Sequence, residues 1–156
     1  MGGRIGSWTS SGDFLPNDSA RSLRRCGEGY VVGGWTRDKP PGSPRLPLAR
    51  RLDAQGESPG RRSEPFADTE TAASACDHEG KIVSASTRTT GNLTDVVLHA
   101  YLDPEQPPVW QATYAGQGMG DDQAATLACD AWGYCAWGGY EWADGKNRAI
   151  VQIHYP

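Results

Sequence analysis

The chain has 156 residues, of which 37% are hydrophobic and 22% charged, with 20 glycines, 11 prolines and a formal net charge of −4. A mean hydropathy of −0.61 implies a modest core and excludes one large helical bundle. No apolar run of 18 residues occurs, so we expect no membrane span. Many turn residues and few long amphipathic stretches favour an all-β fold in a single repeat domain, residues 1–156.

Charge is spread unevenly along the chain. Residues 1–62 carry 11 basic and 6 acidic side chains, whereas residues 63–156 carry 4 and 13. No known nucleic-acid motif accompanies the basic part, so we expect no nucleic-acid partner. The first residues lack the apolar core of a signal peptide, and the compartment stays open.

Two distant segments match each other in a Trp, an Asx-Asp-x-Ala step, a Leu and a Gly-Gly-aromatic end. The matching residues are Trp8, Asn17, Asp18, Ala20, Leu23 and Gly33–Trp35 in the first copy, and Trp110, Asp121, Asp122, Ala124, Leu127 and Gly138–Tyr140 in the second. A weaker copy without the Trp lies between them. A second block, Leu48–Asp53, lies 50 residues before Leu98–Asp103. This period predicts units at about 8–57, 58–109 and 110–156.

The segment 36–67 holds six of the eleven prolines, so we expect it to be loop-rich and degenerate, with an outer strand retained at 46–52. Further along, short strands are predicted at 96–101, 110–114, 124–129, 134–138 and 151–155. Asp130–Gly133 predicts a three-residue hairpin loop with left-handed Gly133, and Asp77–Gly80 repeats the pattern.

These landmarks resemble the β-propeller repeats of bacterial surface and secreted proteins, including the seven-bladed-propeller-type and delta-60 repeats. The resemblance is carried by Trp110, Asp121, Asp122, Ala124, Asp130, Gly133 and Gly139. It implies a partial β-propeller of two to three four-stranded blades in a surface or secreted protein. Three units are too few to close a ring. We therefore expect completion by further blades of a longer chain, or self-association.

The cysteines leave two interpretations open. If Asp130 pairs with Tyr134, Cys129 faces Cys135 at a non-hydrogen-bonded position, where a cross-strand disulfide fits. The alternative is two small buried apolar residues. Cys76 faces Ile82 in its own unit, and Cys26 lies in a shortened turn, so both are expected to stay free.

The glycine-rich stretch 116–122 lacks the Lys-Ser/Thr of a phosphate loop. Asp121 and Asp122 are weak candidates for calcium, but their match to Asn17 and Asp18 favours a turn role. We expect no metal, no cofactor and no catalytic residue.

Aromatic residues are the remaining candidates for function. Trp137 is expected in the core, whereas Trp132, Trp142 and Tyr140 could stack on sugar rings or partner side chains. The sequence thus favours a non-enzymatic scaffold that binds protein or carbohydrate. One alternative is a hydrolase or lyase with a site built from blade loops, in which Asp77, His78, Asp121 and Asp122 would converge. The other is a truncated product without activity.

Overall fold

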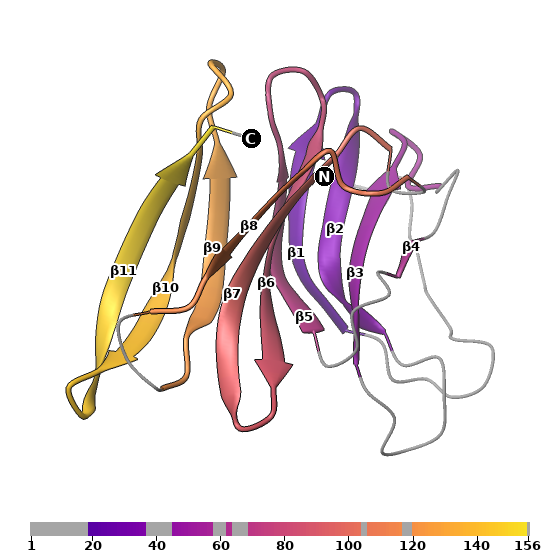
Figure 1. The fold of residues 1–156 in the computed structure, drawn as a ribbon. Helices are drawn as coiled ribbons and strands as arrows, with labels where there is room; N and C mark the ends of the chain where they lie inside the picture. Colours follow the sequence, from indigo (N-terminus) through magenta and orange to yellow (C-terminus); the bar gives the residue numbers. More distant parts are fainter. Residues whose placement is uncertain are drawn as a thin grey trace, which may run out of the picture.

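The computed structural model describes residues 19–36, 45–57, 62–63, 69–103, 106–116 and 120–155. Within these ranges the chain forms strands and no helix, so the predicted all-β class is confirmed (Figure 1). No helix that could cross a membrane occurs in the described residues. The predicted landmarks Trp8, Asn17 and Asp18 lie outside them.

Three antiparallel sheets follow one another along the chain, and each strand pairs with its sequence neighbour. The first sheet contains β1 (Ser19–Cys26), β2 (Gly29–Thr36), β3 (Leu46–Leu52) and β4 (Arg62–Ser63). The second contains β5 (Thr69–Cys76), β6 (Ile82–Thr90), β7 (Leu93–Tyr101) and β8 (Trp110–Tyr114). The third contains β9 (Gln123–Cys129), β10 (Cys135–Ala143) and β11 (Lys146–His154).

The predicted strands at 46–52 and 110–114 coincide with β3 and β8. The predicted units place 110–114 at the start of the third unit. In the structure this segment is hydrogen-bonded to β7 and forms the fourth strand of the second sheet. The sheets thus span 19–63, 69–114 and 123–154.

A β-bulge marks the same place in all three sheets. The extra residue of the first strand is Arg21 in β1, Ala72 in β5 and Ala125 in β9. The next residues, Ser22, Ala73 and Thr126, pair with Gly33, Ala85 and Gly138. The bulge therefore gives an alignment of the three sheets that depends on hydrogen bonding rather than on residue identity.

This bulge alignment confirms the match of Gly33–Gly34 with Gly138–Gly139. It corrects the match of Leu48 with Leu98, because Gly33 pairs with Ala49 and Ala85 pairs with Leu98. The first hairpin has a shorter loop than the second, so the spacing between equivalent residues is not constant. A slip of one residue moves a side chain to the opposite face of its sheet.

Three hairpin loops share one aspartate-based geometry. Asp130 Oδ1 accepts hydrogen bonds from the backbone N–H groups of Trp132 and Tyr134, both at 2.9 Å. Gly133 has a φ of 91° and Gly80 one of 82°, which confirms the predicted turns. The same loop also follows β3, where Asp53 Oδ1 accepts from the N–H groups two and four residues later. This third loop was not predicted from the sequence.

The sheets pack face to face through their first strands (Figure 1). Strands β1 and β2 pack on β5, and β5 and β6 pack on β9. Between the first two sheets lies a small core of Cys26, Val31, Ala49, Ile82 and Tyr101. The larger core between the second and third sheets includes Trp137, which is fully buried as predicted.

Both pairs of cysteines form disulfides. The Cys129–Cys135 bond, here called the hairpin disulfide, joins paired residues of β9 and β10 whose Cα atoms are 4.0 Å apart. That short separation is typical of a non-hydrogen-bonded pair. The structure thus selects the disulfide over two buried thiols.

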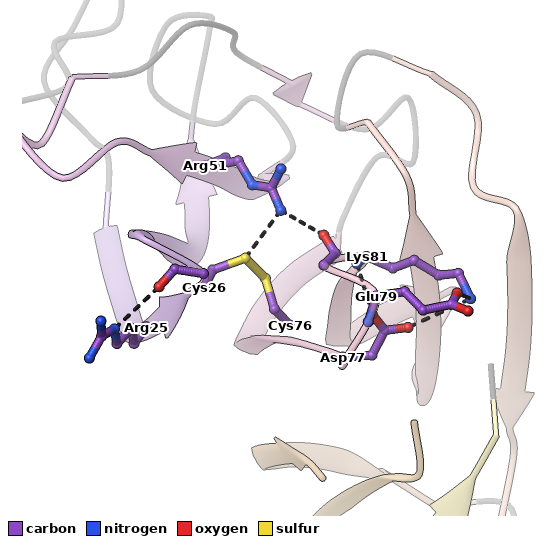
Figure 2. The surroundings of a disulfide bond; sticks show 9 residues. Arg25, Cys26, Arg51, Cys76, Asp77, Glu79 and Lys81 are labelled. Carbon is purple, nitrogen blue, oxygen red and sulfur yellow. Dashed lines mark hydrogen bonds and ion pairs between the residues drawn. A yellow bond between two sulfur atoms is a disulfide. The ribbon is translucent and has the colours of Figure 1, made fainter. Parts of the chain in front are cut away.

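The expectation that Cys26 and Cys76 stay free is wrong. Cys26 and Cys76 form a second bond, here called the inter-sheet disulfide, which joins the ends of β1 and β5 (Figure 2). Cys76 does pair with Ile82 in the backbone ladder, but its side chain points out of that sheet toward the first one. The prediction failed because it considered partners only within one sheet.

The inter-sheet disulfide is surrounded by polar groups of both sheets. The Arg51 guanidinium lies 3.2 Å from Cys26 Sγ and donates a hydrogen bond of 2.6 Å to the Gly80 carbonyl (Figure 2). Arg51 is on β3, and Gly80 is in the β5–β6 turn. One side chain thus fastens the first sheet to the second beside the covalent link.

Candidate functional site

A groove of about 440 Å³ is lined by residues of the second and third sheets. It lies at the end that carries the β6–β7 and β10–β11 hairpins, the lower end in Figure 1. The residues that line it are Asn92, Leu93, Gly120, Asp121, Tyr140, Trp142 and Asn147. Two predicted candidates, Trp142 and Tyr140, therefore lie together in one groove.

Trp142 is positioned by one contact to its backbone and one to its ring. Asp122 Oδ1 accepts a hydrogen bond from the Trp142 backbone N–H at 3.3 Å. Gly120 lies against the ring, because a Cβ added there would be 2.2 Å from Trp142 Cδ1. With 42% of its surface exposed, Trp142 offers a fixed aromatic face to the groove.

The segment before β9 is fixed to the second sheet. The Asp122 backbone N–H donates to the Thr94 carbonyl at 2.9 Å, and Thr94 Oγ1 donates to Asp121 Oδ1 at 3.2 Å. Burial raises the pKa of the Asp122 carboxyl, opposed by the hydrogen bond from Trp142. Asp122 thus positions Trp142, whereas Asp121 remains at the groove.

Tyr114 on β8 also links the second sheet to the third. Its hydroxyl donates to Glu141 Oε2, and its ring lies 5.5 Å from that of Trp137. Burial and the contact with Glu141 raise the pKa of Tyr114 to about 12. The pair connects β8 to β10.

Trp132 is not part of the groove. It is 75% exposed in the β9–β10 turn, at the other end of the third sheet. Tyr134, two residues later in the chain, makes an edge-on ring contact with Tyr155 at 5.3 Å, and both are exposed. The structure therefore separates Trp132 from Trp142 and Tyr140.

The weak metal candidates have other roles. Asp122 is 2% exposed and faces the Trp142 backbone, while Asp121 accepts from Thr94. Among the residues that the structure describes, no group of three His, Cys, Asp or Glu side chains could hold a metal ion.

Asp77 and His78 lie in the β5–β6 turn, at the opposite end of the second sheet from Asp121 and Asp122. Eight residues of strand separate the two ends, on the order of 25 Å. The four side chains that the enzyme hypothesis brings together therefore do not share a cavity.

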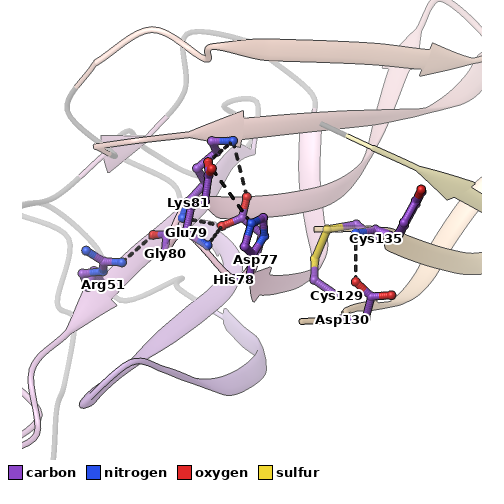
Figure 3. Close-up of polar contacts among 10 residues, drawn as sticks. Arg51, Asp77, His78, Glu79, Gly80, Lys81, Cys129, Asp130 and Cys135 are labelled. Carbon is purple, nitrogen blue, oxygen red and sulfur yellow. Dashed lines mark hydrogen bonds and ion pairs between the residues drawn. A yellow bond between two sulfur atoms is a disulfide. The ribbon is translucent and has the colours of Figure 1, made fainter. Parts of the chain in front are cut away.

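Within that turn the charged groups satisfy one another (Figure 3). Asp77 Oδ1 accepts from the N–H groups of Glu79 and Lys81, both at 2.9 Å. Lys81 Nζ lies 2.7 Å from Glu79 and 3.6 Å from Asp77. The hydrogen bond from Lys81 lowers the pKa of Glu79, and the same contact raises the pKa of Lys81. These contacts of Asp77, Glu79 and Lys81 stabilise the turn.

Sequence reasoning missed the polar side of the groove. Asn92 follows Gly91 in the β6–β7 turn and Asn147 lies at the start of β11, and neither was among the candidates named from the sequence. Their positions in adjacent hairpins at the same end of two sheets were the available signal. No family model matches the sequence, and no curated protein is significantly similar to it.

Proposed function

We propose that the chain is a non-enzymatic β-propeller-type scaffold that binds carbohydrate in the groove of Trp142 and Tyr140. In this proposal its three sheets are successive blades of a larger surface or secreted assembly. The recurring bulge, the meander topology and the packing through first strands support the blade interpretation. A function in binding then depends on the groove.

The observation that carries the proposal is the composition of that groove. A sugar presents an apolar ring face and a rim of hydroxyls, so its sites combine an aromatic platform with planar amides or carboxylates. Trp142 and Tyr140 supply the aromatic part, and Asn92, Asp121 and Asn147 supply the polar part. Because the groove is open at the surface, it fits the end of an extended glycan chain better than a small molecule that must be enclosed.

The two exposed tryptophans allow a matched test. Binding of the intact chain would be screened on a glycan array, and the best glycan would then be titrated by calorimetry. Trp142→Ala should weaken binding at least about tenfold, which corresponds to ~1.4 kcal/mol. Trp132→Ala, the control, should leave the affinity unchanged because Trp132 lies at the other end of the sheet.

A third variant separates ligand contact from folding. Asn147→Ala removes a rim amide from an exposed position. It should therefore weaken binding with an unchanged circular dichroism spectrum. Absence of any glycan ligand, or binding that depends on Trp132 and not on Trp142, would contradict the proposal.

A further inference from the structure

The outer face of the third sheet, which points away from the second sheet, is apolar and open. Its part nearest the β9–β10 turn has two ladder rows, Ala128–Ala136–Ile153 and Thr126–Gly138–Val151. Val151 is 71% exposed and Ile153 is 68% exposed. No side chain in either row is charged. An apolar face of this kind favours contact with another protein surface.

The corresponding face of the second sheet is fully covered. By the bulge alignment, its rows are Ala75–Val83–Ala100 and Ala73–Ala85–Leu98. All six residues are at most 5% exposed, and they pack with Leu127 and Trp137 of the third sheet. In this molecule the face of the second sheet that is equivalent to the exposed outer face of the third sheet is therefore covered by the Leu127–Trp137 face of the next sheet.

The first sheet has an exposed face equivalent to the face of the third sheet that covers the second sheet. The bulge alignment places Leu23 and Val32 of the first sheet where Leu127 and Trp137 lie in the third, since each is a ladder pair at the same distance from the bulge. A groove of about 380 Å³ opens there, with Leu23, Val32 and Leu52 in its lining. Leu23 is 55% exposed.

We propose that the outer face of the third sheet in one copy docks head to tail on the Leu23 groove of a second copy. Val151 and Ile153 then occupy the places that Leu98 and Ala100 have at the junction inside the chain. The contact is heterologous, because it joins two different surfaces. Tyr140 and Trp142 of the carbohydrate groove continue the same face of β10 beyond Gly138, but neither docking row contains a residue that lines the groove, so this proposal is argued from different residues.

Charge favours the same pairing. In the described residues 19–36 and 45–57, six arginines outnumber three carboxylates. In residues 120–155, five carboxylates outnumber two basic side chains. Opposite net charges on the two ends attract in a head-to-tail arrangement, whereas two like ends would repel.

Sedimentation equilibrium of the intact chain tests the proposal. We expect a mass of at least twice 16.8 kDa at about 100 μM protein. The double variant Val151→Glu/Ile153→Glu and the single variant Leu23→Glu should each be monomeric. All three substituted side chains are exposed, so the fold should persist, as checked by circular dichroism. Leu102→Glu, at an exposed position elsewhere, should associate like the parent chain.

Mixing the two monomeric variants gives the sharpest outcome. Each retains the surface that the other has lost, so an equimolar mixture should form a one-to-one dimer and nothing larger. A monomeric parent chain at about 100 μM, or variants that fail to complement, would overturn the proposal. Self-association of the Leu23 variant alone would do so as well, because it would indicate a contact between like faces. The monomeric variants should retain any glycan binding, which separates this result from the test of the groove.

Discussion

Gly139 lies where β10 passes closest to the bulge of β9. A Cβ added to Gly139 would be 1.9 Å from the Gln123 carbonyl oxygen. Carbon normally stays about 3.3 Å from a carbonyl oxygen, so Gly139→Ala would force the strands apart by about 1.4 Å. Overpacking and weakened ladder hydrogen bonds should together lower the free energy of unfolding by about 2–3 kcal/mol.

The adjacent glycine supplies the matched control. At Gly138 an added Cβ would meet Thr126 Cγ2 at 3.3 Å and other atoms only beyond that distance. Gly138→Ala should therefore change the free energy of unfolding by less than about 1 kcal/mol, and relief of glycine's chain entropy would favour the folded state. Both variants would be measured by urea denaturation followed by tryptophan fluorescence. Equal effects of the two substitutions would refute the bulge register.

Two further predictions concern covalent links and pH. Replacing Cys26 and Cys76 by alanine should lower the free energy of unfolding by about 4 kcal/mol, because the inter-sheet disulfide joins residues 50 positions apart. Replacing Cys129 and Cys135 should lower it by only about 2 kcal/mol, because the hairpin disulfide joins residues 6 positions apart. Urea denaturation would measure both losses. The raised pKa of Tyr114 means that its contribution to stability is present below pH 10 and lost as pH rises toward about 12. Between pH 10 and about 12 the urea midpoint of Tyr114→Phe should fall less than that of the parent chain. An identical fall in both would argue against the raised pKa of Tyr114.

Local chemistry made several elements predictable. Asp130 and Gly133 specify their hairpin loop because the carboxylate accepts two backbone N–H groups and glycine adopts a positive φ. Once that loop is placed, the pairing of Cys129 with Cys135 follows from ladder geometry alone. The match of 46–52 to the repeated outer strand, and the short run with aromatic ends at 110–114, likewise located β3 and β8 at their observed limits.

Relations between sheets were not predictable in the same way. The bond between Cys26 and Cys76 depends on which faces meet, and a repeat alignment that slips by one residue at Leu48 reverses that face. The groove combines Trp142 with Asn92, which lies about 50 positions earlier in a hairpin of another sheet. The sequence around either residue does not indicate that the other lies close to it in space.

The inter-sheet disulfide also provides the most direct test of the stacking of sheets on which this account depends. Cys26 and Cys76 can be bonded only if β1 and β5 lie against each other at the same end of their sheets. Peptide mass mapping of the unreduced chain should therefore find Cys26 linked to Cys76 and Cys129 linked to Cys135. Free thiols at Cys26 and Cys76, or a bond from either of them to the third sheet, would contradict it.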